Sequence, residues 1–137
     1  MSPGKWLVYV DGASRGNPGP AAIGAVIFNE EGQEIHRLCQ RIGRATNNVA
    51  EYRAAIAGLE AALALGARQV ELRMDSELVV RQLDARYRVR NPALKKLFAR
   101  LQELRWRFQS LEATAIPRKE NQLADRLANQ ALDWGAN

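Results

Sequence analysis

The order of segments along this chain predicts an α/β fold in which a five-stranded mixed sheet is flanked by helices, in the sequence βββαβααβα. Three observations support this fold class. Three β-prone runs separated by turns open the chain, apolar residues then recur at helical spacing, and two later β-prone runs are interleaved with further helical segments. Because no repeat, low-complexity stretch or linker interrupts this pattern, we expect one domain over residues 1–137.

The first three β-prone runs predict an antiparallel meander. They cover residues 6–10, 22–28 and 34–42. The first run ends at Asp11 and leads into the turn-rich segment 12–20. Residues 29–32 form a turn of the kind that joins the two strands of a hairpin, so the second and third strands are expected to be neighbours in the sheet.

The rest of the chain predicts four helices and two more strands. The first helix has its apolar residues at Val49, Tyr52, Ile56, Leu59 and Leu63. Gly66 stops that helix, residues 69–74 alternate as a fourth strand, and residues 77–83 form a short helix. Asn91 and Pro92 are a typical helix start, residues 111–116 predict the fifth strand, and residues 120–134 predict the last helix.

Composition excludes several classes of protein. No apolar run approaches the roughly 20 residues of a membrane span, and the chain does not open on a signal segment. A lone cysteine, Cys39, rules out an internal disulfide framework and favours a reducing cytoplasmic location. With one cysteine and one histidine, His36, a zinc site is not expected, so oxygen atoms must hold any metal. We expect a monomer.

The positive charge is concentrated in one segment. Residues 81–107 carry nine basic and two acidic residues, whereas the remainder carries eleven basic and thirteen acidic ones. A solvated helix face is one interpretation, but we favour a surface that contacts phosphates, with Arg86, Arg88, Lys95 and Lys96 as substrate-binding residues. The aromatic residues of this segment could also contribute to binding, although Trp106 is better explained by core packing.

Four acidic residues stand where solubility does not require them. Asp11 and Asp75 each follow an apolar strand, and Glu51 and Asp125 each flank the buried side of a helix. Taken alone, each could be a cap or a surface charge. Together they can converge at one edge of the sheet, where their mutual repulsion would require cations. Carboxylate oxygens suit Mg²⁺ or Mn²⁺, and a pair of such ions can hydrolyse a phosphodiester without a protein nucleophile.

These residues lie in motifs that resemble the four signature blocks of the type 1 ribonuclease H family. The blocks are Asp11-Gly-Ala-Ser-Arg-Gly-Asn-Pro-Gly-Pro20, Thr46-Asn-Asn-Val-Ala-Glu-Tyr52, Met74-Asp-Ser-Glu77 and Asn121-Gln-Leu-Ala-Asp-Arg-Leu-Ala128. They occur in the family's order and span nearly the whole chain. The resemblance implies a ribonuclease H-like fold and an endonuclease that cuts the RNA strand of RNA–DNA hybrids. It also implies two metal ions bound by Asp11, Glu51, Asp75 and Asp125, and products with 5′-phosphate and 3′-hydroxyl ends.

The resemblance further implies a set of substrate-binding residues. They are Gly12, Ala13, Ser14, Asn17, Arg44, Thr46, Asn47, Asn48, Ser76 and Glu77. Asparagine amides both donate and accept hydrogen bonds, so they can read the 2′-hydroxyl that distinguishes RNA from DNA. Thr46 and Arg44 match a pocket that grips a phosphate of the DNA strand. Helix capping is the alternative role for Asn47 and Asn48.

The chain departs from the family pattern in three ways. Arg118 occupies the loop where many members carry a mobile histidine, and an arginine cannot act as a general base, so we expect it to assist catalysis electrostatically. Glu77 stands where glutamine is frequent. The chain also has no room for the basic helix–loop handle of many relatives, as in handle-less bacterial and archaeal members. Looser strand discrimination is therefore expected, with RNA–RNA duplexes as a possible side substrate.

Two alternatives to a free-standing hybrid nuclease remain open at this point. A non-catalytic nucleic-acid-binding module on the same fold would typically have lost a carboxylate, whereas all four positions are filled here. A nuclease domain of a reverse transcriptase or polyprotein would keep all four. The glycines of the first block do not form a dinucleotide-binding loop, because the G-x-G-x-x-G spacing is absent and a strand follows instead of a helix.

Overall fold

The computed structural model describes residues 4–85 and 88–134, and its element order agrees with the predicted one. The strands are β1 (Trp6–Ser14), β2 (Gly19–Phe28), β3 (Glu34–Ala45), β4 (Gln69–Met74) and β5 (Ser110–Ala115). The helices are α1 (Asn47–Ala64), α2 (Glu77–Leu83), α3 (Pro92–Arg105) and α4 (Gln122–Trp134), with a short 3₁₀ helix η1 (Arg118–Glu120) before α4. None of the described helices is long and apolar enough to cross a membrane.

The five strands form one mixed sheet, as the sequence predicts. Their order across the sheet is β3-β2-β1-β4-β5. The first three strands pair antiparallel as the expected meander, whereas β4 joins β1 in parallel and β5 joins β4 in parallel. Parallel neighbours require crossover connections, and α1 and α3 supply them. The early, local half of the sheet is therefore antiparallel and the later half parallel.

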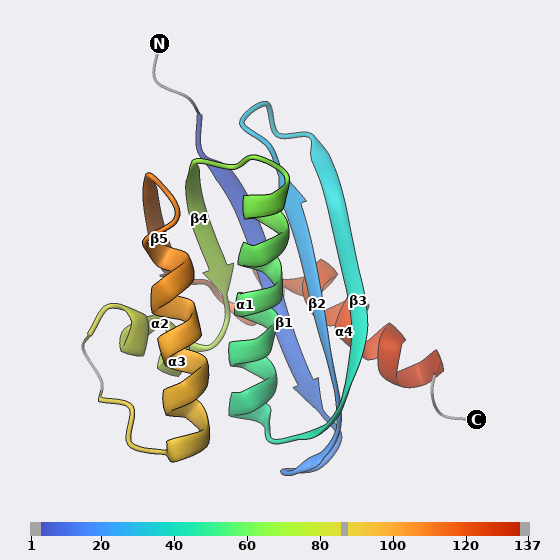
Figure 1. The fold of residues 1–137 in the computed structure, drawn as a ribbon. Coiled ribbons are helices and arrows are strands. Elements are labelled where there is room, and N and C mark those ends of the chain that lie inside the picture. Colours follow the sequence, from blue (N-terminus) through green and yellow to red (C-terminus); the bar gives the residue numbers. More distant parts are fainter. Residues whose placement is uncertain (1–3, 86–87, 135–137) are drawn as a thin grey trace.

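Helices cover the sheet on both faces (Figure 1). α1 packs on β1 and β2 and also contacts α3, whereas α4 packs on the opposite face over β1, β2 and β3. The main core lies between α1, α3 and the sheet, with Val8, Val10, Tyr52, Leu59 and Leu72 among its fully buried side chains. Gly24 of β2 permits the close approach of α4, since a Cβ there would lie 2.3 Å from the carbonyl oxygen of Ala124.

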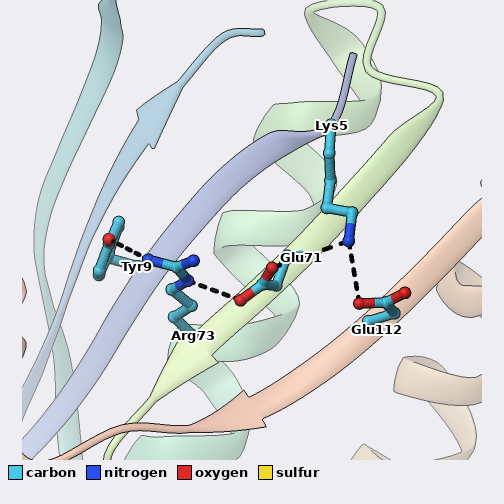
Figure 2. Close-up of polar contacts among 5 residues, drawn as sticks. All are labelled: Lys5, Tyr9, Glu71, Arg73 and Glu112. Atoms are coloured by element: carbon cyan, nitrogen blue, oxygen red, sulfur yellow. Dashed lines mark hydrogen bonds and ion pairs between the residues drawn. The ribbon is translucent and has the colours of Figure 1, made fainter. Parts of the chain in front are cut away.

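β4 shows how one strand serves two surfaces. Val70, Leu72 and Met74 are buried in the main core, and the side chains between them point to the opposite face. On that face Arg73 donates to the Tyr9 hydroxyl at 2.7 Å and to Glu71 at 2.6 Å. Figure 2 shows these residues in a polar row that continues through Lys5 to Glu112 on β5. This part of the sheet is covered by paired charges and not by a helix.

Two predicted boundaries were wrong near the functional residues. β1 continues past Asp11 to Ser14, because its pairing with β2 runs from Leu7↔Phe28 to Ser14↔Ala21. Sheet hydrogen bonds thus override the turn-rich composition of segment 12–20, and only residues 15–18 form the turn. The last helix begins at Gln122 instead of residue 120, since Arg118–Glu120 forms the separate helix η1.

The connection between α2 and α3 is short. α2 ends at Leu83 and α3 begins at Pro92, with Asn91 as the predicted N-cap: its side chain accepts from the backbone N–H groups of Ala93 and Leu94. Arg86, one of the predicted substrate-binding residues, and Tyr87 lie outside the described residues.

Candidate active site

The sheet register brings the first and third predicted carboxylates together. The parallel pairing of β1 with β4 ends at Tyr9↔Arg73, so Asp11 and Asp75 each lie two residues beyond the last pair on neighbouring strands. Because side chains alternate along a strand, both then point to the same face, about one strand spacing of 4.8 Å apart. Asp11 is buried and Asp75 half-buried. Asp11 does not lie at the end of β1, which continues to Ser14. It lies just beyond the point where the pairing of β1 with β4 ends, and this point locates the site.

Glu51 reaches the same place from α1. This helix begins at Thr46, whose Oγ1 accepts from the backbone N–H of Val49 at 3.2 Å. The Glu51 side chain is buried against β1, where its Oε1 accepts from the backbone N–H of Gly12 at 2.9 Å. Gly12 makes this contact possible, because a Cβ there would lie 2.3 Å from the carbonyl carbon of Ala50. Oxygen atoms of Asp11, Glu51 and Asp75 all lie within 4.8 Å of one another.

Burial and mutual repulsion perturb the protonation of this cluster. Burial, followed by the charges of Glu51 and Asp75, raises the pKa of Asp11 to about 10. Burial also raises the pKa of Glu51 to about 7, although hydrogen bonds from Asp11 and Gly12 partly offset it. Both carboxyl groups therefore hold their protons more tightly than free carboxylic acids do when no cation is bound. Charge that the protein itself leaves uncompensated marks the site as one for cations.

Asp125 lies beside this group of three, on the first turn of α4. It raises the pKa of Asp11 through a hydrogen bond, and it lines the same cleft. The amide Nδ2 of Asn129, one helical turn later, donates to Oδ1 of Asp125 at 3.2 Å and to its backbone carbonyl at 3.0 Å. At the start of α4 the buried Asn121 donates to the carbonyl of Val10 at 2.8 Å, which ties α4 to the strand that carries Asp11.

The donor set fits a hard divalent cation. The side chains of this group, Asp11, Glu51 and Asp75, provide carboxylate oxygens, which Mg²⁺ and Mn²⁺ prefer as ligands. Oε2 of Glu51 is buried and forms no hydrogen bond within the described part of the chain, so this acceptor lacks the partner that a buried oxygen normally has. The described residues group no histidine or cysteine with these acids.

The carboxylates lie in a cleft of about 880 Å³ that also contains most of the predicted RNA-contacting residues. From the predicted set, the cleft is lined by Gly12, Ala13, Ser14, Asn47, Ser76, Glu77 and Arg118. Two of these side chains also have structural roles: the Ser14 hydroxyl donates to the carbonyl of Ala45 at 2.7 Å, and Ser76 caps α2 by accepting from the N–H of Val79. The backbone of residues 12–14 therefore remains the part of this strand best placed to contact a ligand.

Four of the substrate-binding residues that the family resemblance implies lie outside this cleft. Oδ1 of Asn17 accepts from the backbone N–H of Asn47 at 3.0 Å, which holds the turn before β2 against the start of α1. Thr46 is the helix cap, so capping is shown for Thr46, whereas Asn48 is simply exposed. Arg44 lines a separate pocket of about 210 Å³ together with Arg41, which was not among the predicted residues.

The basic segment divides into structural and free cations. Arg100 pairs with Glu60 and Glu103, and Arg105 donates to the carbonyl of Leu83, so these two contribute to packing. Arg88, Lys95 and Lys96 are exposed around the start of α3 and form no ion pair with any residue that the structure describes. Trp106 is 81% exposed, so the prediction that it packs in the core was wrong.

Sequence reasoning missed two contributors to the site. Asn129 lines the cleft and contacts Asp125, and its position four residues after that acid on one helix is the signal that could have identified it. Ile116 and Pro117 form part of the cleft wall beside Arg118. An isoleucine and a proline carry no chemical signal in the sequence, so only the fold reveals this wall.

The fold and this cluster define a nuclease-like α/β protein with a carboxylate centre, and comparison with known proteins identifies its family. A family model described as reverse transcriptase-like matches residues 9–131. Ribonuclease HI of Halobacterium salinarum is 48% identical over 95% of this chain and 65% of that protein. A bifunctional protein of Mycobacterium tuberculosis is 47% identical over 96% of this chain. The chain spans only 36% of that relative's length.

Solved structures agree with this result. The crystal structure of the Halobacterium salinarum RNase H1 superposes with a TM-score of 0.92 at 48% identity, covering 95% of this chain and 98% of that one. LC11-RNase H1, crystallised with an RNA/DNA hybrid, gives a TM-score of 0.91 at 43% identity, with coverage of 96% and 99%. The chain belongs to the type 1 ribonuclease H family, as its four motif blocks predict.

Proposed function

We propose that this chain is an endonuclease that hydrolyses the RNA strand of RNA–DNA hybrids with divalent metal ions. The observation that carries the proposal is the convergence of Asp11, Glu51 and Asp75 within 4.8 Å in an open cleft, with one buried oxygen of Glu51 unpartnered among the described residues. The complex of LC11-RNase H1 with an RNA/DNA hybrid supports the choice of substrate, because that protein shares this fold at 43% identity.

Each carboxylate has a role that its surroundings favour. Asp11, Glu51, Asp75 and Asp125 would hold the ions, and two such ions supply an activated water and a stabilised leaving 3′-oxygen, which gives 5′-phosphate and 3′-hydroxyl ends. Glu51 is oriented by the N–H of Gly12, and Asp125 by the amide of Asn129. The chain itself positions groups and provides no nucleophile.

The floor of the cleft supports recognition of RNA. Along β1 the backbone of Gly12, Ala13 and Ser14 lies beside Asp11, and Asn47 faces it from the start of α1. An amide side chain can both donate to and accept from a 2′-hydroxyl, which the DNA strand lacks. Glu77 can only accept from that hydroxyl when ionised, and it adds a negative charge to the cleft.

Arg118 lines the same cleft as the carboxylates, on η1. Its guanidinium stays protonated, so its contribution is to stabilise negative charge on the phosphate or to release product. Arg118→Ala should lower the turnover number at saturating substrate, and Arg118→Lys should restore part of it. An unchanged turnover number in Arg118→Ala would remove this residue from the mechanism.

The deciding experiment is hydrolysis of an end-labelled RNA–DNA hybrid. We expect cleavage with Mg²⁺ or Mn²⁺ and none with a chelator, together with a loss of at least about 10³-fold in Asp11→Asn, Glu51→Gln and Asp75→Asn. Asp84→Asn is the matched control, because this exposed acid ends α2 away from the cleft. Ligation of the products without further treatment tests the predicted 5′-phosphate and 3′-hydroxyl ends.

The same assay separates this function from a non-catalytic binding module. The wild type of such a module would bind the hybrid without cleaving it. Its Asp11→Asn variant would bind the hybrid with unchanged affinity. Metal-independent cleavage, or full activity of Asp11→Asn, would contradict the proposed mechanism.

Cleavage of RNA–RNA duplexes is a second candidate activity. The direct connection from α2 to α3, with no inserted handle, removes one surface that could select the DNA strand. We expect slow cleavage of duplex RNA that disappears in Asp75→Asn. An absence of Asp75-dependent cleavage of duplex RNA would dispose of this side activity while leaving the hybrid nuclease intact.

A further inference from the structure

A second cleft adjoins the first on the far side of Asp125. Its volume is about 630 Å³, and η1 and the first turns of α4 form its walls. The cleft is lined by Arg118, Lys119, Gln122, Asp125, Arg126 and Asn129. Arg118, Asp125 and Asn129 line both clefts, so the second one is a continuation of the active-site cleft along α4.

The second cleft carries positive charge on side chains that have no ion-pair partner among the described residues. Arg118, Lys119 and Arg126 are exposed, and none of their side chains forms an ion pair or a hydrogen bond with any residue in the described ranges. By contrast, Lys5 and Arg73, in the polar row on the part of the sheet that no helix covers, are each paired with carboxylates. Three cations with unpaired side chains surround one concave surface, and Asp125 is the sole acid among the described residues that line it, so the cleft attracts an anion.

We propose that Lys119, Gln122 and Arg126, together with Arg118, form a subsite for a backbone phosphate of the RNA strand, next to the phosphate that is cut. This inference rests on the proposed function. A strand that places one phosphate at the carboxylates must leave the first cleft on both flanks, and the shared residues make the second cleft its direct exit on one of them. Arginine and lysine bind phosphate oxygens, and the Gln122 amide can donate to a phosphate or a 2′-hydroxyl.

The subsite would affect binding and not chemistry. Lys119 and Arg126 do not line the active-site cleft, whereas Arg118 does and is therefore unsuitable for separating the two effects. Contacts to a neighbouring phosphate register the strand without reading its sequence. We therefore expect the double variant Lys119→Ala/Arg126→Ala to raise KM severalfold and to leave kcat unchanged.

The test uses a set of hybrids in which the RNA strand is shortened stepwise on one flank or the other of a fixed cleavage position. The double variant should lose affinity severalfold for hybrids that extend along one flank and should match the wild type once that flank is removed. Its slope of log affinity against log salt should also be smaller by about 1 to 2, because each lost phosphate contact removes roughly one unit. Affinities are measured by fluorescence anisotropy in the Asp11→Asn background, which prevents cleavage.

The matched control is Arg37→Ala/Arg68→Ala, which also removes two positive charges. Both cations are exposed, Arg37 near the start of β3 and Arg68 directly before β4, so they lie at the end of the sheet where these two strands begin and line neither cleft (Figure 1). The control should bind every hybrid as the wild type does. Equal losses in both double variants, losses that do not depend on flank length, or no loss at all would overturn the subsite. Failure of the wild type to bind or cleave any hybrid would instead overturn the proposed function, and the subsite with it.

Discussion

The backbone N–H of Gly12 donates to Oε1 of Glu51 at 2.9 Å, and this one bond joins the strand that carries Asp11 to the helix that carries Glu51. It leaves Oε2 of Glu51 buried and unpartnered among the described residues. A carboxylate held by one oxygen and free at the other is oriented toward the remaining acids before any cation arrives. The glycine is thus part of how the site is built, although it contributes no side chain.

Gly12→Ala should therefore damage both the fold and the site. The new Cβ would meet backbone atoms of Ala50 and Glu51 at 2.3–2.5 Å, and backbone cannot move aside without displacing α1 from β1. We expect a loss of about 2–3 kcal/mol in the free energy of unfolding, measured by urea titration, and a large loss of hybrid cleavage.

Gly58→Ala, on the α1 side of the contact between α1 and β1, is the control for this prediction. There the added Cβ would meet side-chain atoms and not backbone, namely the Cγ1 atoms of Val10 and Val8 at 2.6 and 3.0 Å. Its loss of stability should be smaller, and its cleavage activity should follow its stability. If Gly12→Ala also loses activity only in proportion to its stability, Gly12 has no special role in placing Glu51.

Stability without metal should fall as the pH rises. The pKa of Glu51 is raised from 4.5 to about 7 and that of Asp11 from 3.8 to about 10. At a pH between the unfolded and folded pKa of either group, the folded state therefore binds more protons than the unfolded state. The free energy of unfolding must then decrease with pH in this range. Calorimetry in a chelator should show the melting temperature falling from about pH 5 to about pH 9.

Divalent metal and the Asp11→Asn substitution should each increase the stability of the protein at high pH. Cations that replace the protons should raise the melting temperature, and the increase should grow with pH because fewer protons must be displaced. Asp11→Asn removes the most strongly perturbed carboxyl, so at pH 8 in a chelator it should be more stable than wild type by about 1–3 kcal/mol while inactive. A flat pH profile for the wild type would contradict the strong burial of this pair.

The order of the elements along the chain was predictable because it depends on local patterns, and the four acids were predicted from strand ends, helix flanks and motif blocks. The order of the strands across the sheet was not predicted. Alternation predicted β4 to the residue. Apolar spacing located the buried side of α1 only in part, because Tyr52 and Leu59 are buried but the other three predicted residues are only half-buried, and small residues make up most of that side. Asp11 shows where this reasoning fails: composition after residue 11 indicates a turn, but pairing with β2 extends the strand to Ser14. Such pairing is a long-range interaction, and no local pattern reports it.

Side-chain partnership could not be predicted at all. Arg100 and Lys96 lie on one helix and look alike in the sequence, yet Arg100 is paired with Glu60 from α1, whereas Lys96 pairs with no described residue. The exposure of Trp106 was equally unpredictable. This residue follows the last turn of α3, so its burial depends on the path of the chain after the helix and not on helical spacing. Spacing identifies a helix face, and only the packed fold shows which charges on it are free.

A buried hydrogen bond between Tyr52 and Gln82 ties α1 to α2, the helix that directly follows Asp75 and Ser76. The Tyr52 hydroxyl donates to Oε1 of Gln82, and both side chains are buried. Tyr52→Phe leaves that oxygen without its donor, so it should cost about 1–3 kcal/mol of stability. Tyr52→Phe/Gln82→Leu removes both polar groups and should recover most of the loss in a double-mutant cycle by urea unfolding. Additive losses would show that the pair does not interact.

Asn129 should set the position of Asp125 without supporting the fold. Its amide donates to Oδ1 of Asp125 at 3.2 Å from one helical turn away, and the residue is only half-buried. Asn129→Ala should therefore lower kcat roughly three- to tenfold while changing stability by less than about 1 kcal/mol. Asn129→Asp places a second carboxylate beside Asp125, so it should raise the Mg²⁺ concentration needed for half-maximal activity. Gln130→Ala, exposed on the same helix, is the matched control, and an equal effect from both alanine variants would assign the change to α4 as a whole.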